Sequence, residues 1–250
     1  MLSLIMNKVF AINEFDNKKK KNHIIFICDH ASNNIPISFN NLGLDKIALK
    51  SHISWDIGVK NFCLEISRLL KQSCFISNFS RLVIDPNRNV NSEDIIVSNS
   101  WGQKIPGNEN LSFDEKRKRI ENFYNIYHCH LGEFINKKLS QYKKVKLIAI
   151  HSFNKKIGFC ERGIEIGLLF NKNINLLLKI QKRLAEKQVY FARNFPYSGF
   201  FYNYTLDRHS KNAQLDNISL EIRNDLICDQ KGIKKYVKLF KDIFEELIND

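Results

Sequence analysis

Apolar residues along the chain fall into short continuous runs and into longer stretches with helical spacing. The run at residues 24–27 is β-branched and aromatic, as a strand buried on both faces requires. Further runs predict strands at 82–84, 145–150, 163–170 and 218–222, and apolar stripes with a period of three to four residues predict helices over 57–70, 112–142, 174–184 and 231–248. Strands that alternate with helices predict an α/β sandwich around a mixed, mostly parallel sheet.

The polar stretches between these elements are predicted to be loops. Residues 1–22 are expected to form an irregular lead-in or an edge strand, and 34–50 and 91–110 to form two long loops of the kind that often carry function. At 250 residues the chain is long enough for one substantial core. We therefore expect a single domain over residues 1–250.

Composition narrows the class of protein. Hydrophobic residues make up 44% of the chain and charged residues 26%, which is typical of a globular protein. No apolar run is long enough to span a membrane, and the N-terminus lacks the pattern of a secretory signal, so the protein is expected to stay in the cytoplasm. The six cysteines include no C-x-x-C pair, which predicts reduced thiols and argues against disulfides or a cysteine zinc site.

The net charge of +13 favours acidic partners, either nucleic acid or an acidic small molecule. Lysine is nevertheless spread along the chain together with Asn and Ile, and the one dense run, residues 18–21, is predicted to be a solvated linker. We therefore expect no nucleic-acid partner and no membrane partner. The sequence leaves the oligomeric state open.

Polar residues capable of chemistry follow two of the predicted strands directly. Asp29, His30 and Asn33 come just after the first strand, and His151 ends a later apolar run. If both strands lie in one parallel sheet, the two histidines project from the edge where ligands bind in open α/β sheets, and they could share one metal ion. The alternative for each is a buried histidine with a purely structural role.

Charged residues at other predicted element ends add candidates. Asp56 stands just before a predicted helix, where it could also be only an N-cap. Arg81 and Arg88 flank a predicted strand, and guanidinium groups bind planar carboxylates with a fork of donors. Glu221 lies in a short apolar strand, where a carboxylate is costly to bury unless it is paired or used.

Seven segments, in order along the chain, resemble the N-formylglutamate amidohydrolase family. They are Cys-Asp-His-Ala-Ser-Asn-x-Ile-Pro (28–36), His-Ile-x-Trp-Asp-Ile-Gly (52–58), Ser-Arg-Leu-Val-Ile-Asp-x-Asn-Arg (80–88), Ile-Pro-Gly-Asn (105–108), His-Ser-Phe (151–153), Pro-Tyr-Ser-Gly (196–199) and Glu-Ile-Arg-x-Asp-Leu-Ile (221–227). The resemblance implies a hydrolase that removes formate from N-formyl-L-glutamate and leaves glutamate, a step that completes a route of histidine degradation. It also implies a three-layer α/β sandwich, phosphorylase/hydrolase-like, similar to the zinc-dependent exopeptidases.

The resemblance to the exopeptidases implies a divalent metal ion, expected to be zinc, held by two histidines and a carboxylate, with a late glutamate as general base. His30, His151 and Asp56 match the metal ligands, and Glu221 matches the glutamate. Asn33 competes with Asp56 as third ligand on spacing alone, although a neutral amide is the poorer zinc donor.

The implied substrate is an acidic N-acyl amino acid. Arg81 or Arg88, with Arg223 in reserve, would bind its carboxylates. Asn33 or Tyr197 would hydrogen-bond the tetrahedral intermediate.

Two segments depart from the family pattern. After His-Ser-Phe the family continues with Thr-Pro, where this chain has Asn-Lys (154–155), and the family's later Arg-Pro-Trp-His-Ile-Gly is here Arg-Gly-Ile-Glu-Ile-Gly (162–167). If the replaced Trp-His pair helps to select the substrate, Glu165 would add negative charge near the pocket and disfavour an acidic ligand. Two alternatives therefore stay open: a related deacylase acting on another N-acylated amino acid or a peptide, and a non-catalytic binding relative.

Overall fold

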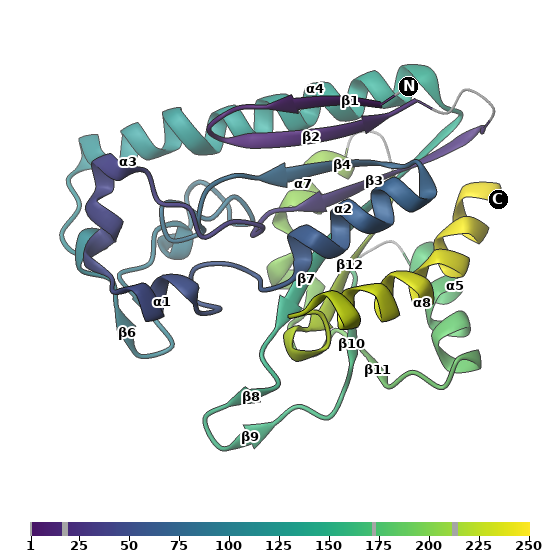
Figure 1. Cartoon of the computed structure of the whole chain (residues 1–250). Helices are drawn as coiled ribbons and strands as arrows, with labels where there is room; N and C mark the ends of the chain where they lie inside the picture. The colour runs from purple at the N-terminus through teal and green to yellow at the C-terminus, as the bar shows by residue number, and fades with distance from the viewer. Residues whose placement is uncertain (1, 17–19, 172–173, 212–214) are drawn as a thin grey trace.

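A computed structural model describes residues 2–16, 20–171, 174–211 and 215–250, with residues 2–6 described by their backbone alone. Its centre is an eight-stranded sheet in the order β1-β2-β4-β3-β7-β12-β10-β11 (Figure 1). The strands are β1 (Leu2–Met6), β2 (Phe10–Phe15), β3 (Asn22–Cys28), β4 (Ser73–Ser77), β7 (Lys144–Phe153), β10 (Ile166–Leu169), β11 (Phe191–Arg193) and β12 (Asp216–Arg223).

The four central strands of the sheet, β4, β3, β7 and β12, all run parallel. Antiparallel pairings join β1 to β2, β2 to β4 and β10 to β12, and β11 pairs with β10 in parallel. The sheet is therefore mixed with a parallel centre, as the sequence predicts. Its parallel strands all end at one edge, so residues that follow them come together there.

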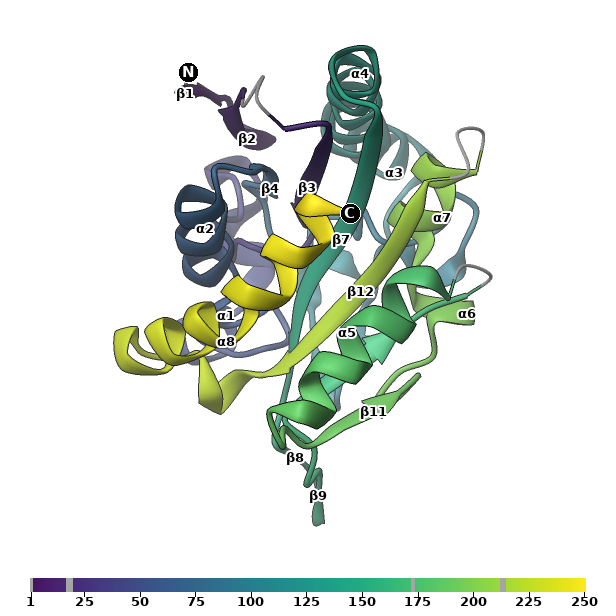
Figure 2. The same cartoon turned by 90° about the vertical axis from the view of Figure 1, so that its right-hand side faces the viewer.

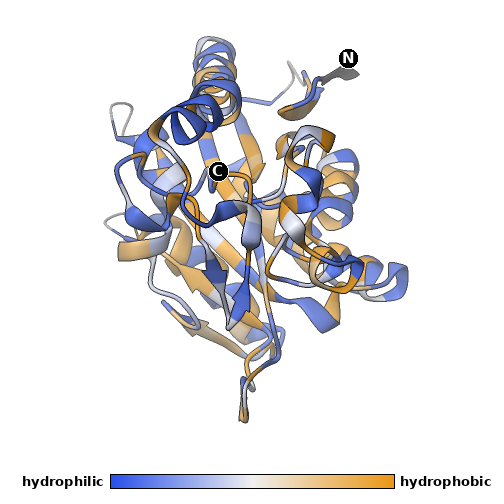
Figure 3. Cartoon of the chain, turned by 90° about the vertical axis from the view of Figure 1, so that its left-hand side faces the viewer, coloured by the Kyte–Doolittle hydropathy of each residue, from blue (hydrophilic) through white to orange (hydrophobic). Residues whose placement is uncertain are grey.

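Helices cover both faces of the sheet and make the sandwich three layers deep (Figures 1 and 2). Alternate residues of β3 point to opposite faces, so Ile24 and Phe26 pack in one core and Ile25 and Ile27 in the other. The first core is closed by α2 (Val59–Leu70), α5 (Asn175–Glu186) and α8 (Gln230–Asn249), and the second by α4 (Asn125–Gln141) and α7 (Tyr204–Ser210). Figure 3 shows hydrophobic stretches along the central strands between these helices. The structure confirms the predicted α/β sandwich.

The long helix predicted over 112–142 is present as three joined segments. Ser112 and Glu115 form a capping box at the start of α3 (Phe113–Arg119). A π-helical turn, Ile120–Tyr124, then leads into α4. Of the described residues, no helix is both long enough and apolar enough to cross a membrane.

Several connecting segments hold more regular structure than the sequence predicts. The lead-in contributes the edge hairpin of β1 and β2, and only part of the lysine run at 18–21 lies within the described residues. The remaining short elements are the 3-10 helices Ile37–Gly43, Glu93–Ile95, Pro106–Asn108 and Asn224–Leu226, the helices α1 (Lys46–Lys50) and α6 (Gly199–Tyr202), and the hairpins of β5 (Asn99–Ser100) with β6 (Gln103–Lys104) and β8 (Lys156–Ile157) with β9 (Cys160–Glu161).

The apolar run at 82–84 is not a strand, and that prediction is wrong. The strand in this part of the chain is β4, and the run forms a buried turn instead. Ser80 holds the turn, because its carbonyl oxygen accepts from the N–H of Val83 and its hydroxyl from the N–H of Leu82. A short apolar run indicates burial but does not by itself fix the backbone conformation.

Candidate active site

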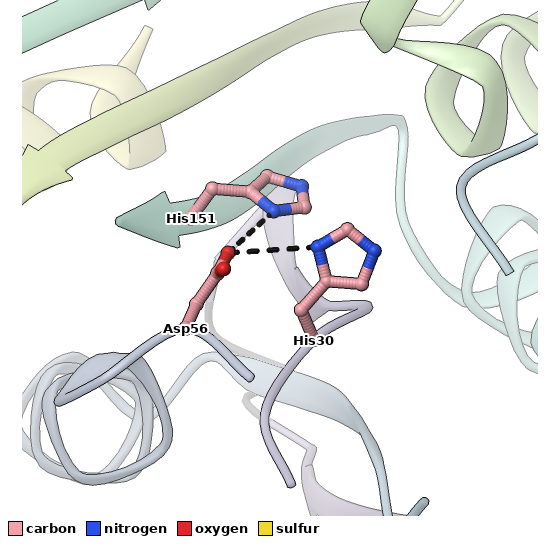
Figure 4. A group of neighbouring side chains, drawn as sticks. All are labelled: His30, Asp56 and His151. Atoms are coloured by element: carbon pink, nitrogen blue, oxygen red, sulfur yellow. Dashed lines mark hydrogen bonds and ion pairs between the residues drawn. The ribbon is translucent and has the colours of Figure 1, made fainter. Parts of the chain in front are cut away.

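His30, Asp56 and His151 lie together at the edge of the sheet where the parallel strands end. His30 follows β3, His151 lies near the end of β7, and Asp56 precedes α2. The Asp56 Oδ2 atom is 2.9 Å from His151 Nδ1 and 3.6 Å from His30 Nδ1, and Figure 4 shows the carboxylate between the two rings. All three side chains are buried.

Asp56 is held at this position by the backbone and does not cap α2. Its N–H donates to the carbonyl oxygen of His30 over 2.8 Å, and the N–H of Ser152 donates to Asp56 Oδ2 over 3.3 Å. The N-cap of α2 is Gly58, without a side-chain hydrogen bond. The N-cap alternative for Asp56 is therefore wrong, and its carboxylate is free to serve the histidines.

Two further carboxylates orient the imidazole rings from outside. Asp85 Oδ1 is 2.7 Å from His30 Nε2, and Asp29 Oδ2 is 3.6 Å from His151 Nε2. Tyr127 holds Asp29 by donating its hydroxyl to Oδ1 over 2.7 Å. Asp85 beside Nε2 favours the His30 tautomer protonated there, which leaves the Nδ1 lone pair of His30 directed toward Asp56. At His151 the hydrogen-bonded nitrogen is Nδ1, which faces Asp56, and Nε2 has no hydrogen-bond partner among the described residues.

Burial and neighbouring charges set the pKa values of His30 and Asp85. Burial lowers the pKa of His30 to about 4, assisted by Arg81 and only partly opposed by Asp85, so the ring is neutral near pH 7. Burial by itself would raise the pKa of Asp85, but His30, Arg88 and Arg81 outweigh it and hold that pKa below its usual range. The pair is therefore a neutral imidazole beside a carboxylate, which is the state that a metal-binding histidine requires.

The His30, Asp56 and His151 side chains fit a metal ion. Each offers one ligand atom, and these atoms lie within 4.8 Å of one another. His30 Nδ1 is buried without a hydrogen-bond partner among the described residues. Two imidazoles and a carboxylate are the protein ligands of many catalytic zinc sites, with a position left open for water or substrate.

A cavity of about 210 Å³ opens onto these three residues. It is lined by four carboxylates and two guanidiniums, from Asp56, Asp85, Asp94, Glu221, Arg81 and Arg88. The carboxyl groups of this lining therefore outnumber its guanidiniums.

Glu221, Arg81, Arg88 and Tyr197 all line this cavity. Glu221 Oε2 is buried and has no hydrogen-bond partner among the described residues, and burial raises the pKa of this carboxyl despite the opposing effects of His151 and Arg81. The Arg81 guanidinium contacts Asp56 Oδ1 through Nη2. Arg88 Nε lies 2.7 Å from Asp94 Oδ2, so both arginines already face a carboxylate.

Asn33 and Arg223, both predicted to bind substrate, do not line the cavity. The Asn33 amide donates to the carbonyl oxygen of Leu49 over 2.9 Å, which occupies it away from the three ligand candidates. Arg223 Nε pairs with Asp225 Oδ1 at 2.7 Å. In this structure neither side chain reaches the cavity, and their binding of substrate stays a prediction.

Glu165 does not lie in the cavity lining either. Its carboxylate accepts a hydrogen bond from the hydroxyl of Tyr236 in α8, on the core side of the sheet edge. The expected negative charge near the pocket is therefore absent at this position. The departure from the family pattern carries no argument against an acidic ligand.

Several lining or supporting residues were not singled out from the sequence. They are His52, Asp85, Asn87, Trp101, Tyr127 and Tyr202. His52, Asp85 and Asn87 belong to the motif segments, so a signal existed for them. Trp101 and Tyr202 stand in segments without periodicity, and only the fold brings them to the cavity.

The family model of N-formylglutamate amidohydrolase matches residues 22–228. The chain belongs to the N-formylglutamate amidohydrolase family. A gene product of Agrobacterium tumefaciens has a similar structure, with 28% sequence identity and a TM-score of 0.89 over 96% of this chain and 94% of that one. An N-formylglutamate amidohydrolase from Ralstonia eutropha shares the fold at 18% identity, with a TM-score of 0.71 over 97% of this chain and 98% of the other. No curated protein sequence matches the chain significantly.

Proposed function

We propose that this family member is a metal-dependent amidohydrolase that cleaves the N-formyl amide of an acidic amino acid, such as N-formyl-L-glutamate. The products would be formate and the free amino acid, which would place the enzyme at the end of a histidine-degradation route. One observation carries the proposal: three buried ligand candidates face a cavity that also holds the carboxyl group of Glu221, whose Oε2 has no hydrogen-bond partner within the described part of the chain.

His30, Asp56 and His151 would hold the metal ion, for which zinc suits the donor set. When bound, a zinc ion polarises an amide carbonyl and lowers the pKa of water to about 7. Asp85 supports this use by holding the proton of His30 on Nε2, and Asp29 lies on the Nε2 side of His151. Asp56, whose backbone N–H donates to the carbonyl oxygen of His30, would be the negatively charged ligand.

Glu221 is proposed as the general base and acid. Its carboxyl group is buried, and the raised pKa brings it closer to neutrality, where a proton can be both accepted and returned. Glu221 would take a proton from the attacking water and deliver it to the nitrogen of the leaving amine. The C–N bond then breaks, and formate leaves.

Arg81, Arg88 and Tyr197 are proposed to position the substrate. All three line the cavity, and the guanidiniums would attract substrate carboxylates. The hydroxyl of Tyr197 could donate to the oxygen of the tetrahedral intermediate. Because Arg81 and Arg88 already face Asp56 and Asp94, a less acidic N-acyl amino acid is the second candidate substrate.

The test is formate release by the purified, metal-loaded protein together with its metal content. We expect turnover of N-formyl-L-glutamate, about one metal ion per chain, and loss of both in the His30→Ala and His151→Ala variants. A parallel screen with N-acetyl amino acids and peptides separates the second candidate. Undiminished turnover in both histidine variants would contradict the proposed site.

A further inference from the structure

A buried arginine beside the cavity, Arg162, has no carboxylate partner among the residues that the structure describes. Its Nη1 lies 3.4 Å from the carbonyl oxygen of Asn154 and 3.5 Å from the hydroxyl oxygen of Tyr197. Both separations are at the long limit of hydrogen bonding. A guanidinium has five N–H donors, so most of its binding capacity is unused.

This lack of a counter-ion distinguishes Arg162 from the other arginines near the cavity. Arg81 contacts the carboxylate of Asp56, and Arg88 pairs with that of Asp94. Arg162 is only 9% exposed, and a buried cation is costly unless an anion pairs with it. The missing anion therefore points to a ligand.

Arg162 is not itself a lining residue of the cavity, but its guanidinium lies directly behind one that is. It follows strand β9, and its guanidinium carbon lies 5.2 Å from the ring centre of Tyr197, which lines the cavity, and 5.6 Å from that of Phe153. The positive charge of Arg162 also lowers the pKa of Glu221, a residue of the cavity lining, against the larger effect of burial. Packing against the two rings restricts the guanidinium, so less entropy is lost when it binds a carboxylate.

We propose that Arg162 receives one carboxylate of the substrate, with the hydroxyl of Tyr197 as an additional donor. This inference rests on the proposed amide hydrolysis and deepens it by defining the substrate as an N-acyl amino acid with a free carboxylate. A guanidinium binds a carboxylate through two parallel N–H bonds. Arg162 can do so without breaking the Arg81–Asp56 or Arg88–Asp94 pair.

The first experiment measures binding without turnover. N-formyl-L-glutamate is titrated calorimetrically into the metal-loaded Glu221→Gln protein, with and without Arg162→Gln. We expect Arg162→Gln to weaken binding by about tenfold or more, because a hydrogen-bonded ion pair is lost. Arg193→Gln is the matched control, since Arg193 is exposed and bonds only the side chain of Gln181, and it should change affinity less than about twofold.

Arg162→Lys, which keeps the charge but not the planar fork, is measured in the same way, and the melting temperature of each variant checks the fold. The lysine variant should bind with intermediate affinity. If Arg162→Gln destabilises this part of the chain, Arg162→Lys still tests the proposal. Equal affinity of the parent and both Arg162 variants would overturn the proposal.

The second experiment uses the active protein and two neutralised substrates, N-formyl-L-glutamine and N-formyl-L-isoglutamine. Arg162→Gln should raise KM for N-formyl-L-glutamate with little change in kcat, and this penalty should vanish for the one amide that lacks the recognised carboxylate. A penalty of the same size for all three compounds would overturn the proposal. If the parent releases no formate but binds N-formyl-L-glutamate through Arg162, the proposed hydrolysis fails and the carboxylate site stands; if the parent does not bind it, the carboxylate site fails.

Discussion

Glu221 and His151 occupy paired positions in the parallel strands β12 and β7. Paired residues of neighbouring strands point to the same face of a sheet, and such strands lie about 4.8 Å apart, so both side chains enter the cavity side by side. The rigid sheet thus fixes the distance between a metal-ligand candidate and the proposed general base. Neither residue depends on a loop for its position.

Glu221→Gln should therefore lower kcat by at least about 100-fold, because glutamine cannot accept the proton of the attacking water. Metal content should be unchanged, since Glu221 is not one of the three ligand candidates. Formate release and metal analysis measure the two effects. Glu165→Gln is the matched control, because Glu165 bonds to Tyr236 outside the cavity, and an equal loss in both variants would contradict the role of Glu221.

Asp85→Asn and Asp29→Asn should each weaken metal binding by about 10- to 100-fold. Asparagine lacks the negative charge that favours a proton on the nearby Nε2, so the tautomer that offers Nδ1 to a metal ion becomes less favourable. Competition with a chelator measures the affinity. Asp94→Asn serves as the control, because Asp94 lines the cavity but pairs with Arg88, and unchanged affinity in both test variants would show that the two carboxylates do not orient the histidines.

Gly58→Ala should destabilise the protein by about 2 to 4 kcal/mol, at the high end for a point mutation. Gly58 has φ +87°, and an added Cβ would lie 2.1 Å from the carbonyl oxygen of Ile227. Gly102→Ala separates backbone strain from steric clash, since Gly102 has φ +82° but no atom within 4 Å of the added carbon. This variant should cost only about 1 kcal/mol of stability. Urea unfolding measures both, and equal losses would rule out a steric contribution at Gly58.

His23 should make the folded state less stable in acid. Burial lowers the pKa of His23 to about 3, and the N–H of Ser73 donates to its Nε2, so the folded protein needs the neutral ring. Below pH about 6.5 the unfolded chain binds a proton that the folded chain does not, and stability falls until the pH reaches about 3.

The His23→Gln variant lacks this titration. The unfolding free energy of the parent minus that of His23→Gln should fall by about 2 kcal/mol as the pH is lowered from 7 to 4.5. Urea unfolding at the two pH values gives that difference. A gap that is independent of pH would mean that His23 has the same pKa in the folded and the unfolded chain.

Local patterns sufficed for the strands β3, β7 and β12 at the centre of the sheet and for the residues at their ends, but not for β4. A buried strand leaves a continuous apolar signal, and His30 and His151 stand directly at the ends of two such runs. The parallel pairing of β3 with β7 then places both histidines at one edge. That Asp56 joins them is implied by the resemblance to the exopeptidases and is not indicated by any local pattern.

The side-chain directions could not be read in the same way. Asn33 is only three residues from His30, yet it turns to the carbonyl oxygen of Leu49, and Arg223 turns to its neighbour Asp225. Arg162 is the opposite case. The fold buries it, although its sequence context does not distinguish it from a solvated arginine. Tertiary packing decides which charged side chains pair with one another, and this cannot be read from the sequence alone.

The four parts of the proposed centre come from β3, the turn before α2, β7 and β12, which are widely separated along the chain. Of the four, only Glu221 is carried by β12. A protein in which β12 had not docked would keep the three ligand candidates but lack the proposed general base. Comparing the kinetics of metal uptake and of formate release during refolding would report separately on the docking of this single strand.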